Sequence, residues 1–116
     1  MLNSDLLSLA KILLPEVLIE YFELIDFKVY PDKIDFYFSE YNIIPDEYAG
    51  ECISKGFYKE ATIQDFPIRG KSVYLHIKRR RWQDKDTGAI IQRQWDLVSK
   101  GTRITKEFAD FLKGLH

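Results

Sequence analysis

Two stretches of the chain alternate apolar and polar side chains with a period of two, and this pattern restricts the fold more than any other feature. The first covers residues 25–29 and 34–38 around a Pro-Asp-Lys turn. The second covers residues 71–82 and 90–98 around a polar turn that contains Gly88. Successive side chains of a strand point to opposite faces of a sheet, so each stretch can bury one face. The sequence therefore predicts two β-hairpins.

Helical patterns lie at the two ends of the chain. A capped, leucine-rich segment over residues 3–14 precedes Pro15, which can open a second helix, while Thr105 precedes an apolar stripe near the carboxyl end. A short strand is expected near residues 57–63. We therefore expect a single α+β domain over residues 1–116, with about five mostly antiparallel strands in two hairpins, two short N-terminal helices and one C-terminal helix.

The charge is distributed unevenly along the chain, although the formal net charge is only −1. Residues 1–66 hold five lysines and thirteen acidic residues, a net charge of −8, whereas residues 67–116 hold twelve Lys and Arg and five acidic residues, a net charge of +7. The domain would thus combine an acidic half of helices and hairpin with a basic half of hairpin and helix. Such asymmetry indicates a basic face that meets a polyanion, although the two halves could equally neutralise one another inside the fold.

A run of four cations at residues 78–81 ends the first strand of the predicted second hairpin. Each arginine presents a planar fork of donors that matches phosphate oxygens, and phosphate contacts would relieve the mutual repulsion of the run. On a strand, Arg79 and Arg81 share one face, and Lys78 and Arg80 share the other. The alternative is a solvated strand edge whose charges discourage aggregation. Together with nearby cations and the basic start of the last helix, the predicted nucleic-acid contacts are Arg69, Lys71, Lys78, Arg79, Arg80, Arg81, Arg93, Arg103 and Lys106.

Residues with catalytic potential are few and scattered. His76 lies on a predicted strand without a spaced partner, and Cys52, the single cysteine, is expected to be a small core residue. Trp82 and Trp95 could stack on bases, but tryptophans in hairpins more often fill cores. We therefore expect a protein that is not an enzyme and binds no metal or cofactor. The chain also lacks an apolar run of about 20 residues and a secretory signal, so we expect a cytoplasmic protein without a membrane partner.

Part of the second half resembles a known family. The run QDFPIRGKSVYLHIKRRRW, followed by TGAIIQRQWDL and GTRITKEFADFL, is similar to the amino-terminal region of ISL-three-like insertion-sequence transposases. In that region a Pro and a Gly precede a strand that ends in an Arg-rich segment, a zinc-binding hairpin turn follows, and an Arg-x-Thr element begins a helix. The matching positions, spread over somewhat under half of the chain, are Pro67, Gly70, Arg79 to Arg81, Arg103 and Thr105.

The chain departs from this family in its cysteines. Typical members carry one cysteine pair in the turn and another upstream, whereas this chain has only Cys52, so a tetrahedral zinc site cannot be assembled. The sequence is similar to a cysteine-less subgroup encoded by a short reading frame, which makes residues 67–116 a degenerate, zinc-finger-like unit without zinc. The resemblance implies binding to transposon DNA ends, or support of a separately encoded catalytic transposase chain. It does not imply strand transfer, because the family's catalytic domain lies downstream of the matched region.

Two functions are open at this stage. The first is a non-catalytic DNA-binding module of a transposase system, which contacts phosphates through the basic hairpin. It requires that the cations from Arg69 to Arg81 and those around Arg103 form one contiguous face. The second is a protein-interaction subunit that docks onto a separate catalytic transposase chain through the acidic half or through exposed tyrosines such as Tyr37 and Tyr58. Strongly salt-dependent DNA binding distinguishes the first from the second.

Overall fold

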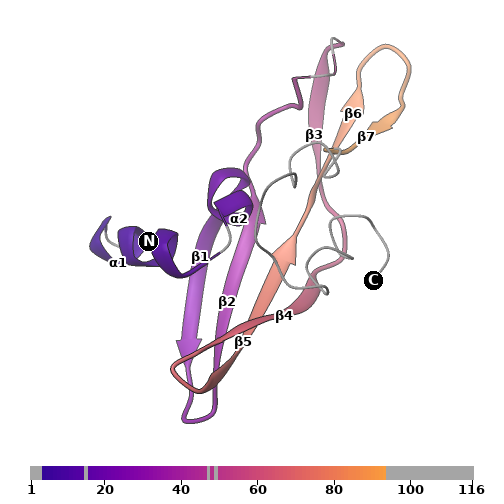
Figure 1. Ribbon diagram of the computed structural model, residues 1–116. Helices are drawn as coiled ribbons and strands as arrows, with labels where there is room; N and C mark the ends of the chain where they lie inside the picture. Colours follow the sequence, from indigo (N-terminus) through magenta and orange to yellow (C-terminus); the bar gives the residue numbers. More distant parts are fainter. Residues whose placement is uncertain (1–3, 15, 47, 49, 94–116) are drawn as a thin grey trace.

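The computed structural model describes residues 4–14, 16–46, 48 and 50–93 of the chain (Figure 1). Two short helices, α1 (Ser4–Leu13) and α2 (Glu16–Tyr21), precede the strands. The strands are β1 (Phe22–Val29), β2 (Lys33–Glu40), β3 (Cys52–Phe57), β4 (Ala61–Ile68), β5 (Lys71–Lys78), β6 (Arg80–Asp84) and β7 (Ile90–Ile91). They form a four-stranded sheet in the order β1-β2-β5-β4, here sheet A, and a three-stranded sheet in the order β3-β6-β7, here sheet B.

This architecture contradicts the predicted α+β fold class. The described part of the chain is mostly β, with seven strands in two sheets rather than about five strands in two hairpins. Its helical segments are short and confined to residues before β1. The predicted C-terminal helix lies outside the described residues.

The centre of sheet A is a parallel strand pair, which the alternation did not predict. β1 and β2 form an antiparallel hairpin, but β2 and β5 run in parallel, from Lys33 opposite Ser72 to Ser39 opposite Lys78. Parallel neighbours need a crossover connection, and residues 41–70, which include β3 and β4, provide it. The expectation of mostly antiparallel strands in two separate hairpins is therefore wrong at this position.

The hairpin that contains β5 is formed with β4. The two strands pair antiparallel and are joined by Arg69 and Gly70, whose φ angles of 49° and 80° are typical of a two-residue type I′ turn. The predicted single strand over residues 71–82 is wrong, because β5 ends at Lys78 and β6 begins at Arg80. The predicted return strand over residues 90–98 begins at β7, which pairs with β6, and its residues 94–98 lie outside the described part of the chain.

The strand pairs β4–β5 and β3–β6 form one bent antiparallel ribbon that runs from sheet A into sheet B (Figure 1). β5 continues into β6 through Arg79 alone, whereas β3 continues into β4 through residues 58–60. The Tyr58 N–H donates to the Arg79 carbonyl at 2.8 Å across this irregularity. Extra residues on one strand of a pair bend it and increase its twist, so the ribbon changes sheet here. We call residues 58–60 and Arg79 the junction.

The hydrophobic core lies on one face of sheet A. Val73, Leu75 and Ile77 of β5 are fully buried, as the alternation along residues 71–77 predicts. Leu14, which follows α1, and Leu18 of α2 are buried in the same cluster, so the helical segment covers this face of the sheet.

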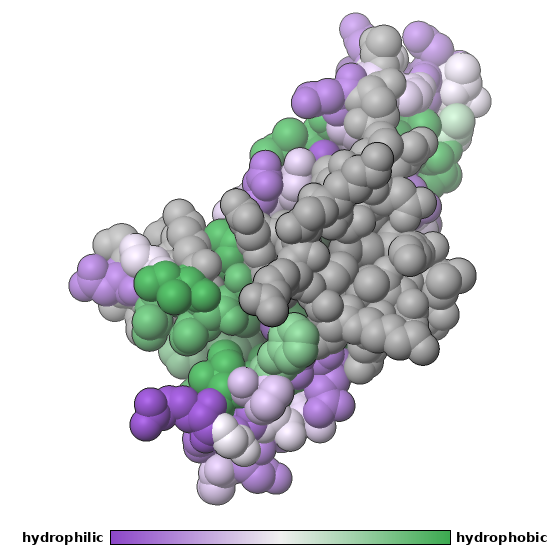
Figure 2. Space-filling view, in the orientation of Figure 1, coloured by the Kyte–Doolittle hydropathy of each residue, from purple (hydrophilic) through white to green (hydrophobic). Residues whose placement is uncertain are grey.

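The edge strand β1 is less regular than its sequence pattern. A bulge at Ile25 shifts the register between β1 and β2, and both Ile25 and Val29 are exposed instead of buried. Figure 2 shows apolar surface gathered where α1 and β1 lie in Figure 1.

Candidate nucleic-acid interface

The structure divides the predicted cations among three places. Arg69 and Lys71 lie at the β4–β5 turn, the run 78–81 lies at the junction, and Arg93 is buried. Lys71 and Arg79 are eight positions apart in extended chain, which is roughly 26 Å at the usual rise per residue of a strand. The expected single contiguous face is therefore wrong for the described residues. The remaining two predicted contacts, Arg103 and Lys106, lie outside them.

Of the two cations at the β4–β5 turn, Lys71 stabilises the fold. The Lys71 ammonium donates to the carbonyl oxygens of Tyr30 and Pro31, at 2.7 and 3.3 Å, and so ties this turn to the turn between β1 and β2. Arg69 is exposed, but it occupies a left-handed turn position at the far end of the ribbon from the junction.

Arg80 and Arg93 are bound to one buried carboxylate, Glu40, whose side chain is only 1% exposed. The Arg93 Nε donates to Glu40 Oε2 at 3.0 Å, and the Arg80 backbone N–H donates to Oε1 at 3.0 Å. The Arg93 guanidinium also lies 4.6 Å from the centre of the Tyr21 ring. Burial raises the pKa of Glu40, and the bonds from Arg80 and Arg93 oppose that effect. Arg93 therefore forms an ion pair with the acidic half instead of facing a polyanion. The Arg80 guanidinium donates to the Glu40 backbone carbonyl at 3.2 Å and to Ser54 Oγ at 2.6 Å.

Arg79 and Arg81 have a different environment. Because side chains alternate along a strand, they point to the face opposite Arg80. Their guanidinium carbons lie 5.6 and 5.7 Å from the centre of the Tyr58 ring, so the tyrosine is flanked by two cations. The Arg81 Nη2 donates to the Lys55 carbonyl at 3.3 Å, which places the β3 backbone beside this pair.

The opposite strand adds two lysines to this surface. Lys55 and Lys59 are exposed, and Lys59 lines a shallow cavity of about 340 Å³ together with Tyr58, Arg79 and one carboxylate, Glu60. The sequence did not predict Lys55 and Lys59 as contacts and indicated Tyr58 only as a protein-docking residue, since all three belong to the acidic half and the β3–β6 pairing brings them to the arginines. We call Lys55, Tyr58, Lys59, Arg79 and Arg81 the basic aromatic patch.

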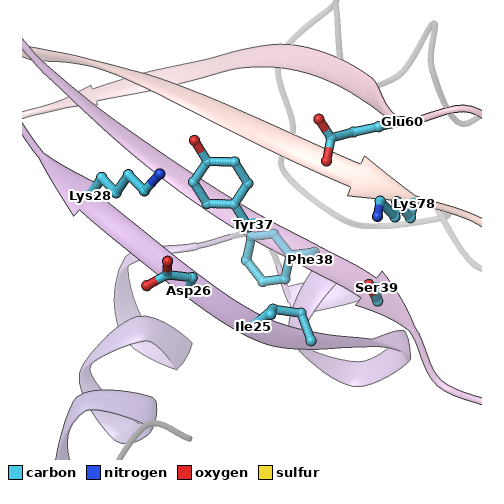
Figure 3. A pocket seen from close by; sticks show the side chains of 8 residues that line it. All are labelled: Ile25, Asp26, Lys28, Tyr37, Phe38, Ser39, Glu60 and Lys78. Carbon is cyan, nitrogen blue, oxygen red and sulfur yellow. The ribbon is translucent and has the colours of Figure 1, made fainter.

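Lys78 lies apart from this patch. It lines a second shallow cavity, of about 260 Å³, beside Tyr37 on the polar face of sheet A (Figure 3). Lys28 lines the same cavity, but so do the carboxylates of Asp26 and Glu60. The charges of opposite sign offset one another, so this cavity does not extend the basic surface.

Of the two tryptophans that could stack on bases, the structure describes one, Trp82. Trp82 is fully buried, and its indole N–H donates to Asn42 Oδ1 at 2.8 Å. It is therefore a core residue of sheet B, the use that hairpin tryptophans more often have. Trp95 lies outside the described residues.

Polar side chains connect the two parallel strands β2 and β5 at the centre of sheet A. His76 Nε2 lies 3.0 Å from Asp35 Oδ1, its Nδ1 lies 3.1 Å from Thr62 Oγ1, and its ring stacks on Tyr37 at 4.6 Å. The sequence shows no spaced partner for His76, because Asp35 is 41 positions away and meets it only through the pairing of β2 with β5. The hydrogen bond from His76 first, and then Lys33, hold the pKa of Asp35 below its ordinary value against the opposing effect of burial.

We expect Asp35 to make the free energy of unfolding depend on pH in acid. A carboxyl group whose pKa is lower in the folded than in the unfolded state contributes stability above its unfolded pKa, and this contribution is lost as the pH falls through the folded pKa. The stability difference between the native chain and Asp35→Asn should thus be largest at neutral pH and shrink below about pH 4. Burial raises the pKa of Asp65, an effect of the opposite sign that both proteins share and that cancels in the difference.

Urea unfolding at a series of pH values checks this expectation, with Asp32→Asn, an exposed turn variant, as the control. A difference between native and Asp35→Asn proteins that stays constant with pH would contradict it.

The described structure is that of a mostly β protein whose sheet junction carries a basic aromatic patch. No family model, curated protein or solved structure matches the chain. Among the described residues, no helix is both long enough and apolar enough to cross a membrane. Within the same part of the chain, no group of three or more His, Cys, Asp and Glu side chains is arranged to hold a metal ion.

Proposed function

We propose that the chain is a non-catalytic DNA-binding module that contacts phosphates through the basic aromatic patch. The observation that carries this proposal is that the guanidinium carbons of Arg79 and Arg81 both lie close to the Tyr58 ring, at 5.6 and 5.7 Å from its centre. A guanidinium group held over a ring uses its face for the aromatic contact and keeps its N–H donors in its own plane, where a phosphate binds those that the protein does not use. In Arg81, Nη2 already donates to the Lys55 carbonyl and Nε is buried.

The lysines of the opposite strand strengthen this proposal. Lys55 and Lys59 bring the number of patch cations to four, and they come from the half of the chain whose net charge is −8. Part of the acidic charge of that half is paired internally, because Glu40 forms a buried ion pair with Arg93. Local segregation of charge, rather than the net charge of each half, is what a polyanion meets at a surface.

The resemblance to transposases supports a transposon end as the DNA in question. The matched Gly70 has a positive φ of 80° in the β4–β5 turn, and the matched run of arginines lies at the junction. The shared pattern thus corresponds to positions with structural roles in this fold. We propose that the module serves a transposase system in which another chain performs catalysis.

Replacing both Arg79 and Arg81 with glutamine is expected to remove much of the salt dependence of DNA binding. Each phosphate neutralised on duplex DNA adds about −0.9 to the slope of log affinity against log salt concentration. The native chain should show a slope of about −3 or steeper, and the double variant should be shallower by about 2. Fluorescence anisotropy of a labelled duplex over a salt series measures both slopes.

The matched control removes two exposed cations that lie outside the patch. Arg69→Asn keeps a residue type that tolerates the left-handed turn, and Lys85→Gln removes a charge beyond the Asp84 end of β6. This control should keep the native slope. If the salt slope became equally shallow in the two double variants, total charge rather than the patch would drive DNA binding. A native chain that binds no DNA at low salt would favour docking onto a separate catalytic chain instead.

A further inference from the structure

We propose that two copies of the chain associate through their β1 strands, which pair antiparallel about a two-fold axis and join two copies of sheet A into one. This proposal rests on the geometry of β1 and does not depend on DNA binding.

The edge of sheet A at β1 is bordered by exposed apolar side chains. Ile25 and Val29 of β1 are 49% and 58% exposed, and Leu9, Ile12 and Leu13 of α1 are exposed as well. β1 ends the strand order of the sheet, and α1 extends beyond it in Figure 1. A sheet edge beside an apolar surface is a template for pairing with another strand. In the dimer, α1 of each copy overhangs the β1 strand of the other and places its apolar residues there.

The hydrogen bonds at the two ends of the β1–β2 hairpin show which backbone groups face outward. The N–H of Tyr30 and the carbonyl of Tyr21 both bond to residues on the β2 side. Backbone groups alternate between the two sides of a strand, and the bulge lies between these ends. The groups of Leu24, Phe27 and Val29 therefore point away from β2, toward a second strand.

The hydrogen bond of the Phe27 N–H agrees with a direction away from β2. It donates to the side chain of Asp26 at 2.8 Å, a local bond between neighbouring residues. When Leu24 lies opposite the partner's Phe27, the outward groups of both residues are in position to exchange two backbone hydrogen bonds. The two-fold axis produces this pair twice, and the local bond to Asp26 is replaced by a ladder bond.

The same register is complementary in charge. It places Glu23 opposite the partner's Lys28, again twice. On a regular strand these residues, five positions apart, would point to opposite faces, but the bulge at Ile25 changes this. Glu23 pairs with Ser39 of β2 and Lys28 with Asp35, four positions apart, so both side chains lie on the polar face of sheet A.

Neighbouring registers are unfavourable for physical reasons. A shift of one residue turns apolar side chains of one strand toward the polar face of the other. A shift of two residues in one direction places Glu23 opposite the partner's Asp26 instead of the partner's Lys28. Like charges that lie directly opposite one another are destabilising. The pattern of β1 thus favours this register over those shifted by one residue or by two residues in that direction, and the proposed partner is a second copy of this chain.

Charge exchange at the two positions tests the proposal. Light scattering coupled to gel filtration should show a concentration-dependent dimer for the native chain. Glu23→Lys and Lys28→Glu should each raise the dimer dissociation constant at least about tenfold, since two attractive pairs become two repulsive ones. An equimolar mixture of these two variants should restore the dimer, because every pair is again of opposite charge. The double variant Glu23→Lys with Lys28→Glu should dimerise like the native chain.

The control is Glu20→Lys, the same charge change at an exposed position of α2, which should leave the dimer intact. Far-ultraviolet circular dichroism establishes that each variant is folded. If Lys28→Glu does not fold, the dimer dissociation constants of Glu23→Lys and Glu20→Lys are compared, and this comparison alone tests the proposal. A native chain that stays monomeric at all concentrations, equal weakening by Glu23→Lys and Glu20→Lys, or a mixture of folded variants that stays monomeric would each overturn the proposal.

Discussion

Replacing Arg93 with alanine is expected to lower the free energy of unfolding by about 3–5 kcal/mol, because it leaves a buried carboxylate without its charged partner. Glu40 is 2% exposed and Arg93 is 7% exposed, so water cannot take the place of the missing guanidinium. The change also removes the hydrogen bond from Arg93 to the Ile43 carbonyl and the contact with the Tyr21 ring. Urea unfolding monitored by tryptophan fluorescence measures the loss.

The protonation of Glu40 limits this effect and supplies a check on its cause. Burial already raises the pKa of Glu40, and the loss of Arg93 should raise it further. A neutral carboxyl needs no charged partner, so the destabilisation should be smaller at acid than at neutral pH.

The double variant Glu40→Gln with Arg93→Met should recover part of the stability, since no charge is then buried. Removal of the exposed pair Lys85–Glu51, by contrast, should change stability by no more than about 1 kcal/mol. An Arg93→Ala protein whose stability lies within about 1 kcal/mol of the native value would contradict the role given to the Glu40–Arg93 ion pair.

Replacing Trp82 with alanine is expected to cost about 3–5 kcal/mol, the usual range for truncating a large buried aromatic side chain. Trp82 has no exposed surface and is among the largest fully buried side chains of the described chain. It lies on the short strand β6, so few other large side chains are available there to fill the cavity. The expected loss is a large part of the stability of a domain of this size.

Two further variants separate the ring from its N–H group. Trp82→Phe keeps an aromatic ring but leaves Asn42 Oδ1 without its donor, and Asn42→Ala removes the acceptor. Each should cost about 1–3 kcal/mol, less than Trp82→Ala. DNA affinity of the folded Trp82→Phe protein should match that of the native chain, because a buried ring does not stack on bases. A Trp82→Ala protein as stable as the native one, or a loss of DNA affinity in Trp82→Phe, would argue against a core role.

Local patterns predicted local structure well in particular places. The alternation along residues 71–77 identified the buried face of β5, and Gly88 does adopt a positive φ in the turn after β6. The same alternation could not reveal that the chain leaves one sheet and enters another at Arg79. A strand pattern depends on each residue and its near neighbours, whereas the change of sheet depends on the irregular pairing with residues 58–60.

The candidate site shows the same division. The run of arginines identified the junction as the basic part of the chain, and strand alternation separated Arg79 and Arg81 from Arg80. One predicted contact, Arg93, proved to form an ion pair with Glu40, which is 53 positions away. No local property of an arginine distinguishes a phosphate contact from an ion pair, because the same donors serve both.

By itself, the sequence determined where apolar faces form along β5 and where positive charge is concentrated, because both follow from the order of neighbouring side chains. Only the tertiary structure decided which strands pair, that His76 meets Asp35, and that Lys55 and Lys59 join the arginines around Tyr58. The physical reason is that backbone hydrogen bonds between strands carry no information about the identity of the partner. The packing of the whole core selects the partner, and the positions of charged side chains follow from that choice.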